Sequence, residues 1–497
     1  MLPYDDSNPR DIERYAKGLI GKTFQDVLYD SRFLDEAVID SKIDYSNPNQ
    51  KGKLGNLLEE KYFCYKANSD QEPDFPKCGV ELKATCFDVL KNGNLSAGER
   101  LVLTMISYDE PVELDFFKSH AWEKCRLILL IYYERNKALK YNTLYRIGFV
   151  SLVSPLKRDM PIILEDYDKI ITKIRRGYAH ELSESDTMYL GACTKGSTSA
   201  KSLRPQYYNP NILANKRAFC FKRQYMDYIL HTYIIPSHTG ERPYQLETII
   251  DNPMQLQNRS FEDIVLDKLD YFRNWSDLDL CNYFDREYNN NKAQWTDLTY
   301  RMLGIRGNCA EEFVKANIVV KVVRIEQDFS MNESISLPPF NFMEFANEKW
   351  EESQVYNYFS ETKFFFVVFA RDSNVYRLYK YFFWNMPFDH LNRIVYDGWR
   401  NIHYLVKNRM VEFELKETRR GYIVKNNLPK KSDNPIIHIR PHAQKSAYAI
   451  HMNDGRIYES GNINRDANML PQGDWMTTQS FWINNNYFLE YILEFRG

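Results

Sequence analysis

The sequence predicts a mixed α/β fold that occurs twice along the chain, and three observations lead to this prediction. Stretches in which apolar residues recur at helical spacing alternate with short apolar runs of strand length. The 497 residues are enough for two or three domains of roughly 100–200 residues each. Three segments of the first half also recur, in the same order, in the second half, which indicates an internal duplication.

The first half holds the elements of one mixed sheet flanked by helices. Helical spacing of apolar residues predicts helices over residues 11–28, 51–65, 165–176 and 224–233. Short apolar runs predict strands over residues 79–87, 101–107, 126–133, 145–153, 188–193 and 218–222.

A linker is expected between the two halves. Residues 236–258 are rich in Pro, Gly, Asn and Gln, which favour turns and loops. The sequence therefore predicts an N-terminal domain over residues 1–235 and a C-terminal domain over residues 259–497.

The repeated segments show how the two halves differ. Asp74-Phe75 precedes GVELKATCF, and Glu312-Phe313 precedes IVVKVVRI at the same distance. Two further pairs follow in order: WEKCRLILLIYYER (122–135) with SETKFFFVVFARD (360–372), and FCFKRQYMDYIL (219–230) with FWINNNYFLEYIL (481–493). The second copy keeps a lysine, Lys321, but has Val319 in the place of a glutamate.

Charge is distributed unevenly, although the formal net charge is only −2. Residues 195–223 carry seven Lys or Arg and no acid, and residues 416–440 carry seven more against two acids. A solvated charged surface is the ordinary interpretation of such a run. Interleaved Tyr and Phe in the first run favour contact with a phosphate backbone instead.

The composition favours a cytoplasmic protein that is not inserted in a membrane. The N-terminus lacks a basic segment followed by an apolar run, so we expect no signal peptide. The longest apolar runs are of strand length, well below the roughly 18 residues of a membrane helix. The eight Cys form no CxxC pair, which favours reduced thiols over disulfides or a zinc site. No GxxxxGK[ST] loop is present, so no nucleotide cofactor is expected.

One group of residues predicts a catalytic site. In PDFPKCGVELKATCF, strand alternation places Glu81 and Lys83 on one face, and Asp74 comes from the preceding turn. Two neighbouring carboxylates repel each other unless a cation lies between them, and their oxygens suit Mg²⁺. Such a metal can activate water for attack on a phosphodiester. The alternative is an ordinary amphipathic strand with a surface Glu/Lys pair, but Glu59 on the preceding helix adds a third carboxylate.

These motifs resemble the MutH-type endonucleases. KGKLGNLLEEKYF (51–63) followed by DFPKCGVELKATCFD (74–88) is similar to the family's KG…G.LLE helix and DF…GVELK strand. The resemblance implies two tandem restriction-endonuclease-like domains and Mg²⁺-dependent cleavage of duplex DNA at GATC. By position, Asp74 and Glu81 match the metal-binding carboxylates, Lys83 the catalytic lysine and Glu59 the helix glutamate.

The resemblance also implies where DNA binds. Lys51 matches a family lysine near the scissile phosphate, and the late DNA-reading segments correspond to 189–195 and 217–222. We expect DNA contacts in the first half from Lys51, Lys124, Lys195, Arg204, Arg217 and Lys222. The second half has lost the metal-binding glutamate, but it keeps a basic stretch and the segment IHIRPHAQK (437–445). There we expect contacts from Lys430, Lys431 and Arg440.

The leading hypothesis is a type II restriction endonuclease of the bacterial cytoplasm. Its length and second copy resemble the long two-domain restriction enzymes of the family. The C-terminal domain would be catalytically silent and would bind a second GATC duplex as an effector, the alternative being a scaffold. One active site per chain implies pairing with a second copy on DNA. Two other functions stay open: a GATC-specific nickase of mismatch repair, and a DNA-binding protein that does not cut.

Overall fold

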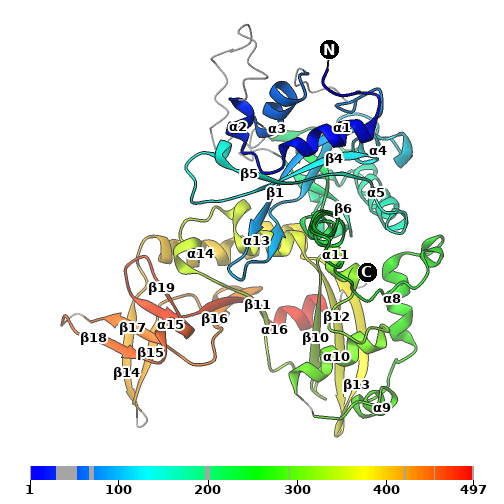
Figure 1. Cartoon of the computed structure of the whole chain (residues 1–497). Coiled ribbons are helices and arrows are strands. Elements are labelled where there is room, and N and C mark those ends of the chain that lie inside the picture. Colours follow the sequence, from blue (N-terminus) through cyan, green and yellow to red (C-terminus); the bar gives the residue numbers. More distant parts are fainter. Residues whose placement is uncertain are drawn as a thin grey trace. The chain divides into compact units, whose positions relative to one another are not determined.

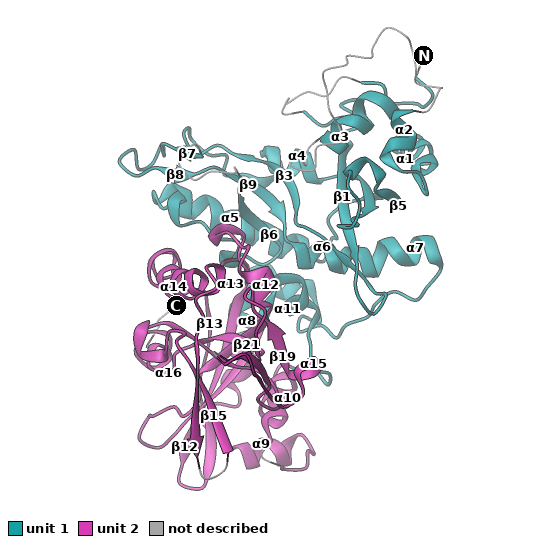
Figure 2. Ribbon diagram, turned by 90° about the vertical axis from the view of Figure 1, so that its left-hand side faces the viewer, with its two compact units in different colours: residues 1–265, 304–318 teal, residues 266–303, 319–497 magenta. Residues whose placement is uncertain are grey.

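The computed structural model describes residues 2–29, 53–65, 72–195, 202–289, 291–418, 421–452 and 454–494. The chain forms two compact units, which are coloured separately in Figure 2. Unit 1 comprises Met1–Val265 and Gly304–Ile318, and unit 2 comprises Leu266–Leu303 and Val319–Gly497. The chain therefore leaves unit 1, returns to it for a short segment, and leaves again. The linker expected at 236–258 lies within unit 1.

The first sheet of unit 1 carries the predicted catalytic motif (Figure 1). Its strand order is β2 (Leu95–Ala97), β1 (Glu81–Val89), β4 (Ile128–Glu134) and β5 (Arg146–Val153). β1 and β4 are parallel, with Glu81 opposite Ile128, and the other pairs are antiparallel. Three N-terminal helices pack their apolar side chains on one face: α1 (Pro9–Ala16), α2 (Phe24–Leu28) and α3 (Lys53–Leu57).

The second sheet of unit 1 is antiparallel, and its strands come from distant parts of the sequence. Its order is β3 (Leu101–Ile106), β9 (Arg217–Phe221) and β6 (Leu190–Thr194). Strands β7 (Leu203–Arg204) and β8 (Ala214–Asn215) form a short hairpin between β6 and β9. The helices of this part of unit 1 are α4 (His120–Cys125), α5 (Met160–Arg175), α6 (Arg223–Ile229) and α7 (Ile235–Thr239). The returning segment contributes α11 (Glu311–Ala316), which packs on α6.

The helices and strands predicted for the first half agree with the structure within about five residues, with one exception, whereas α4, α7, β2, β7 and β8 were not predicted. The helix expected over 11–28 is two helices, α1 and α2, separated by a 3-10 turn at Lys17–Leu19. Gly21 in this break has φ = +85°, a conformation outside the helical region. Thr23 then caps α2 by accepting a hydrogen bond from the N–H of Asp26.

Unit 2 repeats the strand order of unit 1. The order β10 (Ile318–Ile325), β12 (Lys363–Asp372), β13 (Val375–Trp384) corresponds to β1, β4, β5. The order β11 (Ile335–Phe340), β21 (Gln479–Ile483), β16 (Ile437–Pro441) corresponds to β3, β9, β6. The mixed α/β fold expected from the sequence is confirmed, with several sheets flanked by helices.

One pair of hydrogen bonds shows the correspondence at the level of single atoms. In unit 1 the ammonium group of Lys222, directly after β9, donates to the Thr187 carbonyl. In unit 2 the side-chain amide of Asn484, directly after β21, donates to the Asn434 carbonyl at 2.7 Å. In each unit a π-helical turn also follows further along the chain, Leu230–Ile234 in unit 1 and Phe488–Ile492 in unit 2.

The remaining elements of unit 2 surround this framework. Its helices are α9 (Asp277–Tyr283), α10 (Lys292–Met302), α12 (Phe342–Phe345), α13 (Gln354–Glu361), α14 (Tyr396–Lys407), α15 (Ile463–Asp466) and α16 (Asn485–Tyr487). α8 (Phe261–Asp270) spans the point where the chain first enters unit 2. A hairpin of β14 (Phe413–Thr418) and β15 (Gly421–Asn426) precedes β16. A small sheet of β17 (Tyr448–His451), β18 (Ile457–Ser460), β19 (Ala467–Met469) and β20 (Trp475–Thr477) separates β16 from β21.

Two further expectations concern the cysteines and the membrane. All eight Cys are free thiols, and five of them are buried, as predicted for a reduced protein. Within the described ranges, we find no helix with the length and apolar character needed to span a bilayer.

Candidate active site

Glu81 is the central residue of the candidate site. It is the first residue of β1 and only 2% exposed, and its N–H donates to the Leu127 carbonyl at 3.0 Å. Its carboxylate lies between two lysines: Oε1 accepts from Lys83 Nζ at 2.6 Å, and Oε2 accepts from Lys124 Nζ at 2.9 Å. The strand thus holds Glu81 and Lys83 on one face, as their spacing predicts.

Asp74 is brought beside Glu81 by a tight turn. Phe75 and Val80 form an isolated bridge that closes the turn, and Gly79 within it has φ = +69°. A Cβ atom on Gly79 would also collide with the Arg126 guanidinium. Asp74 Oδ2 accepts the N–H of Leu82 at 2.8 Å, and the N–H of Asp74 donates to Glu81 Oε2 at 3.3 Å. These bonds hold both carboxylates at the start of β1.

Glu59 comes from a different element, the π-helical turn Leu58–Tyr62 that continues α3. π-Turns of this kind are frequent at functional sites because they shift side chains relative to a regular helix. Leu57 and Leu58 are fully buried in the core that packs on the sheet, and this packing holds the π-turn in place. The π-turn therefore places the Glu59 carboxylate close enough to Asp74 and Glu81 for their charges to raise its pKa.

The electrostatics of the site indicate a place for a cation. Burial, and next the charge of Asp74, raise the pKa of Glu59 to about 7. Burial, and next the charge of Glu81, raise the pKa of Asp74 to about 6, although the N–H of Leu82 acts in the opposite direction. Buried carboxylates whose pKa values are raised in this way would be stabilised in their ionised form by a cation placed between them.

The carboxylates are not arranged as a completed metal cage. Among the described residues, no three His, Cys, Asp or Glu side chains are placed so that they could hold a metal ion. The two oxygens of Glu81 face lysines instead. The donor set nevertheless fits a hard divalent cation, because it consists of carboxylate oxygens whose mutual repulsion such an ion would relieve.

Of two further residues near the site, Lys124 was expected in a different role and Tyr65 was not identified from the sequence. Lys124, at the end of α4, was expected to contact DNA, but it is 7% exposed and bridges Glu81 to the Glu72 carbonyl, 2.6 Å away. Tyr65 follows the π-turn, and its N–H donates to the Glu59 carbonyl at 3.1 Å. Burial, and next the charges of Asp74, Glu59 and Glu81, raise the pKa of Tyr65. No sequence spacing links either residue to the motif, because both contacts depend on tertiary structure.

The residues expected to contact DNA in unit 1 lie in different environments. Arg217 and Lys222 are 5% and 2% exposed, and their side chains donate to the carbonyls of Ala192 and Thr187. This burial does not favour direct phosphate contacts in the described conformation. Lys195 and Arg204 are half-buried at the end of β6 and in β7. Lys51 lies outside the described residues.

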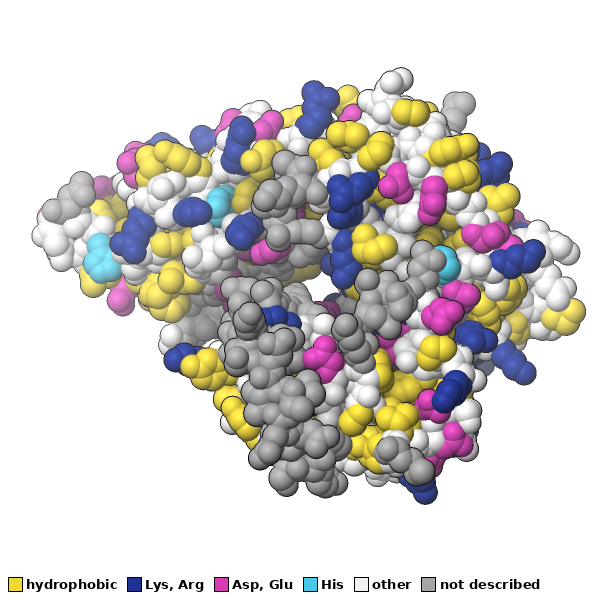
Figure 3. All heavy atoms as spheres, turned by 90° about the horizontal axis from the view of Figure 1, so that it is seen from above, with side chains coloured by type: hydrophobic (Ala, Val, Ile, Leu, Met, Phe, Trp, Pro, Cys, Tyr) yellow, Lys and Arg dark blue, Asp and Glu magenta, His cyan; other side chains and the backbone are white. Residues whose placement is uncertain are grey.

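Basic side chains do not gather in a single block on the face shown in Figure 3. Lys and Arg are interspersed there with acidic and apolar side chains. Among the described residues, this face therefore shows no uniformly positive patch. Binding of a polyanion there would depend on individually placed side chains.

Among the residues of unit 2 that the structure describes, those matched with Glu81 and Lys83 do not form a corresponding acidic site. Val319 packs against the apolar core of unit 2, and the Lys321 ammonium donates to the Ser336 carbonyl at 2.8 Å. Glu312, matched with Asp74 in the sequence, lies instead in α11 of unit 1. Its carboxylate accepts the N–H groups of Ile249 and Ile250 at 2.9 and 3.0 Å, so it is not a remnant of a second site.

The basic residues expected to bind DNA in unit 2 are exposed. Lys430 caps a short 3-10 turn that begins at Lys431, and Arg440 lies in β16. The Arg440 guanidinium is 4.7 Å from the ring centroid of Trp482 in β21. His438, also in β16, is 6% exposed, and its Nδ1 lies 2.6 Å from Asn484 Oδ1.

Comparison with known proteins agrees with this site. The family model for the DNA mismatch repair enzyme MutH matches residues 63–166, which include Asp74, Glu81, Lys83 and Lys124. The type II restriction enzyme Sau3AI of Staphylococcus aureus is 36% identical over 471 residues, covering 89% of this chain and 92% of that enzyme. This chain belongs to the Sau3AI-type restriction enzymes. It is a type II site-specific deoxyribonuclease, and its substrate is DNA.

Membership of the Sau3AI-type enzymes also bears on the cofactor. Restriction endonucleases of this kind generally use a divalent metal ion, which agrees with the carboxylate-rich site at the start of β1. The match to Sau3AI extends across both units, whereas the MutH model covers only part of unit 1. The chain thus shares its second unit with a restriction enzyme. This agrees with the expectation, from its length and internal duplication, that it resembles the long two-domain restriction enzymes.

Proposed function

We propose that this enzyme makes Mg²⁺-dependent double-strand breaks in duplex DNA at GATC. The observation that carries the proposal is the Glu81 carboxylate, placed beside Asp74 and between Lys83 and Lys124. GATC follows from the resemblance of the KG…LLE helix and the GVELK strand to the MutH-type endonucleases. The similarity to Sau3AI over both units supports a restriction enzyme over a repair nickase.

In the proposed mechanism, Asp74 and Glu81 would hold the metal ion, and Glu59 would complete the acidic site. A bound Mg²⁺ would lower the pKa of a water molecule and stabilise the negative charge that develops on the phosphate. Lys83, whose side chain is 23% exposed, is the cation that can reach a phosphate or an attacking water. Lys124 stays buried against Glu81 and holds the carboxylate in position.

The proposal gives unit 2 a second role, as an effector that binds another GATC duplex. The exposed Lys430, Lys431 and Arg440 support DNA binding there. Catalytic silence is supported by Val319, which replaces the metal-binding glutamate and packs in the core. Because one acidic site per chain cuts one strand at a time, two copies would pair on the palindromic site to break both strands.

Plasmid cleavage tests the proposal most directly. Wild type, Glu81→Gln and the matched control Glu60→Gln are compared with Mg²⁺ on plasmids with no, one or several GATC sites. We expect linear products ending at GATC from the wild type and the control, and none from Glu81→Gln. Faster cutting of multi-site plasmids would support the effector role. Nicked circles alone would support the repair-type alternative, and DNA binding without cutting would contradict the catalytic assignment.

A further inference from the structure

The hydroxyl group of Tyr65 is buried and has no hydrogen-bond partner. Among the residues that the structure describes, it is the only buried hydroxyl of which this is true. A buried donor without an acceptor destabilises a fold, because the group has lost its hydrogen bonds to water and gained none in return. The position of this hydroxyl therefore requires an explanation other than stability.

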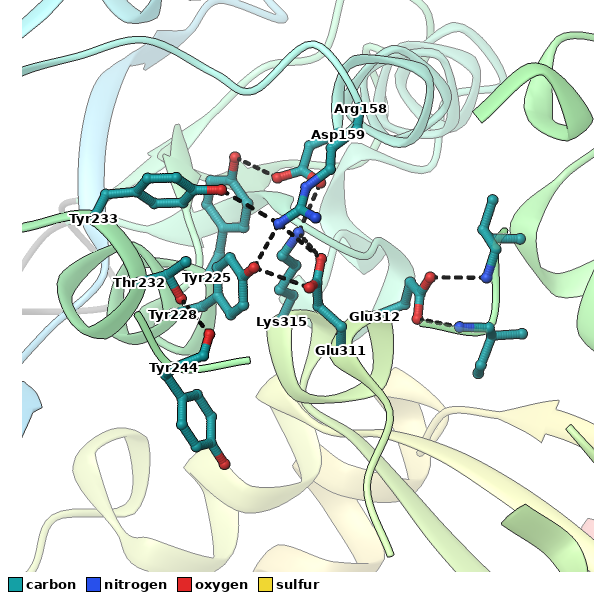
Figure 4. A network of polar contacts seen from close by, with 12 residues as sticks. Arg158, Asp159, Tyr225, Tyr228, Thr232, Tyr233, Tyr244, Glu311, Glu312 and Lys315 are labelled. Atoms are coloured by element: carbon teal, nitrogen blue, oxygen red, sulfur yellow. Dashed lines mark hydrogen bonds and ion pairs between the residues drawn. The ribbon is translucent and has the colours of Figure 1, made fainter. Parts of the chain in front are cut away.

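A second cluster in unit 1 shows how buried tyrosines pair with carboxylates elsewhere in the molecule (Figure 4). There Lys315 of α11, whose side chain is 1% exposed, lies 2.7 Å from Asp159 Oδ1 and 2.7 Å from Glu311 Oε1. The Tyr225 hydroxyl donates to Asp159 Oδ2 at 3.1 Å, and the Tyr228 hydroxyl donates to Glu311 Oε2 at 2.9 Å. Each carboxylate of this cluster thus has both a cation and a tyrosine hydroxyl as partners.

Tyr65 is also held beside carboxylates, those of the acidic site. Its N–H donates at 3.1 Å to the carbonyl of Glu59, which lies in the π-helical turn Leu58–Tyr62. Its ring packs edge-on against Phe75, the residue after Asp74, with the ring centroids 5.4 Å apart. The charges of Asp74 and Glu59 both act on its hydroxyl group. The hydroxyl is thus close to these carboxylates but bonds neither of them.

The three carboxylates of the acidic site differ in the donors that hold them. Asp74 accepts a backbone N–H at 2.8 Å, and Glu81 accepts from two lysines. No residue within the described ranges donates a hydrogen bond to the Glu59 carboxylate. An unpaired donor, Tyr65, and an unpaired acceptor, Glu59, therefore come from one short segment of the chain.

We propose that Tyr65 is a positioning residue of the acidic site, whose hydroxyl donates a hydrogen bond to the Glu59 carboxylate when the site binds a divalent metal ion. The inference rests on the proposed function in one respect, namely that Asp74, Glu81 and Glu59 form the metal site. Carboxylates at metal sites are themselves held by hydrogen bonds, and the groups that supply these bonds increase metal affinity. Tyr65 would thereby gain a charge-assisted hydrogen bond for its unpaired hydroxyl.

This role predicts two effects of Tyr65→Phe, which removes a single oxygen atom. In chelator, the melting temperature should equal or exceed that of the wild type, because no buried hydroxyl is left without a partner. In Mg²⁺, the same rise in melting temperature should require about tenfold more of the ion, because a partner of a metal-site carboxylate is lost. A hydroxyl with a merely structural role would give the reverse, a lower melting temperature in chelator and an unchanged response to Mg²⁺.

Tyr4→Phe is the matched control, because Tyr4 belongs to the same aromatic cluster. Its ring also packs edge-on against Phe75, with centroids 6.1 Å apart, but its hydroxyl donates to the Phe63 carbonyl at 2.7 Å. The full-length wild type and both variants are melted without DNA, in chelator and at increasing Mg²⁺ concentrations at one pH and ionic strength. We expect Tyr4→Phe to melt at a lower temperature in chelator and to keep the wild-type response to Mg²⁺.

Plasmid cleavage gives a second readout of the same effect. We expect Tyr65→Phe to need about tenfold more Mg²⁺ for half of its maximal rate, and to approach the wild-type rate when Mg²⁺ is saturating. An unchanged response of the melting temperature to Mg²⁺ would overturn the inference, whatever the cleavage rate.

The variant Asp74→Asn separates this inference from the proposed function. If Mg²⁺ does not raise the melting temperature of the wild type more than that of Asp74→Asn, the proposed metal site fails, and the inference fails with it. If the response to Mg²⁺ depends on Asp74 but Tyr65→Phe responds as the wild type does, the inference alone fails.

Discussion

Lys124 Nζ lies 2.9 Å from Glu81 Oε2, so a buried ammonium group faces the carboxylate that is central to the acidic site. The same ammonium donates to the Glu72 carbonyl at 2.6 Å. These two contacts of Lys124 fix the position of Glu81 Oε2. Lys83 donates to the other oxygen, Oε1. Lys124 thus contacts the carboxylate proposed to bind the metal ion, although it comes from α4 and not from the motif.

Lys124→Met is therefore expected to lower cleavage at least tenfold, because Glu81 loses one of the two groups that orient it. Its DNA affinity should keep the wild-type dependence on salt, since a buried ammonium releases no counterions from DNA. The control is Lys118→Met, which removes an exposed lysine just before α4. A lower salt slope for Lys124→Met would instead favour a direct phosphate contact.

The raised pKa of Glu59, about 7, predicts how stability depends on pH without metal. A carboxyl group whose pKa is raised by folding binds its proton more tightly in the native state. Its stabilising contribution is therefore present below the unfolded pKa of about 4.3 and is lost as the pH rises through 7. Thermal melts in chelator should show wild type less stable at pH 8 than at pH 5.

Glu59→Gln should flatten this pH dependence, and Glu60→Gln should retain it. Added divalent metal should raise the wild-type melting temperature more at pH 8 than at pH 5, because Asp74, with a pKa of about 6, and Glu59 are then ionised. Identical pH slopes for wild type and Glu59→Gln would contradict the role given to Glu59.

Lys222 and Lys195 are expected to differ, although both lie in the same basic run. Lys222→Met should lower the melting temperature, because its buried ammonium donates to the Thr187 carbonyl. Lys195→Met should leave the melting temperature unchanged and reduce the salt slope of DNA binding by about 1. The measurements are thermal unfolding and DNA titrations at several salt concentrations. If Lys222→Met instead reduced the salt slope and left the melting temperature unchanged, Lys222 would be a DNA contact.

Restoring the lost glutamate in unit 2 should not create a second active site. In the Glu81→Gln background, Val319→Glu is expected to remain inactive and to lower the melting temperature, because it places a carboxylate against the apolar core. No acid from the preceding segment can assist, since Glu312 is bound to the N–H groups of Ile249 and Ile250. Cleavage by this double variant would show that unit 2 retains a latent site.

Much of the fold was predictable because it depends on local patterns. The spacing of apolar residues gave most helices and strands of unit 1, and alternation along β1 placed Glu81 and Lys83 on one face. The duplication was also visible, and the equivalent hydrogen bonds of Lys222 and Asn484 agree with it. The break between α1 and α2 was missed because the apolar spacing continues across Gly21.

The remaining features depend on contacts between residues far apart in the sequence. A run of basic residues does not reveal which of them are buried, so Lys222 and Arg217 were expected at a DNA surface. The pairing of Lys124 with Glu81 joins residues on two elements that only the folded sheet brings together. Glu312 aligned with Asp74 by spacing alone, but the chain returns to unit 1 before β10, and this moves Glu312 into another environment.

The return of residues 304–318 to unit 1 has a consequence for synthesis of the chain. Proteins emerge from the ribosome N-terminal end first, and here the Glu59, Asp74 and Glu81 carboxylates emerge long before Lys315. Until α11 has emerged, Asp159 lacks its buried ammonium partner, and Tyr189 and Tyr225 lack the helix that covers them. The nuclease unit therefore cannot reach its final packing co-translationally until the first stretch of unit 2 has also been made. A nascent chain that stalls before α11 has emerged contains the acidic residues, but the part of unit 1 that packs on α11 is incomplete.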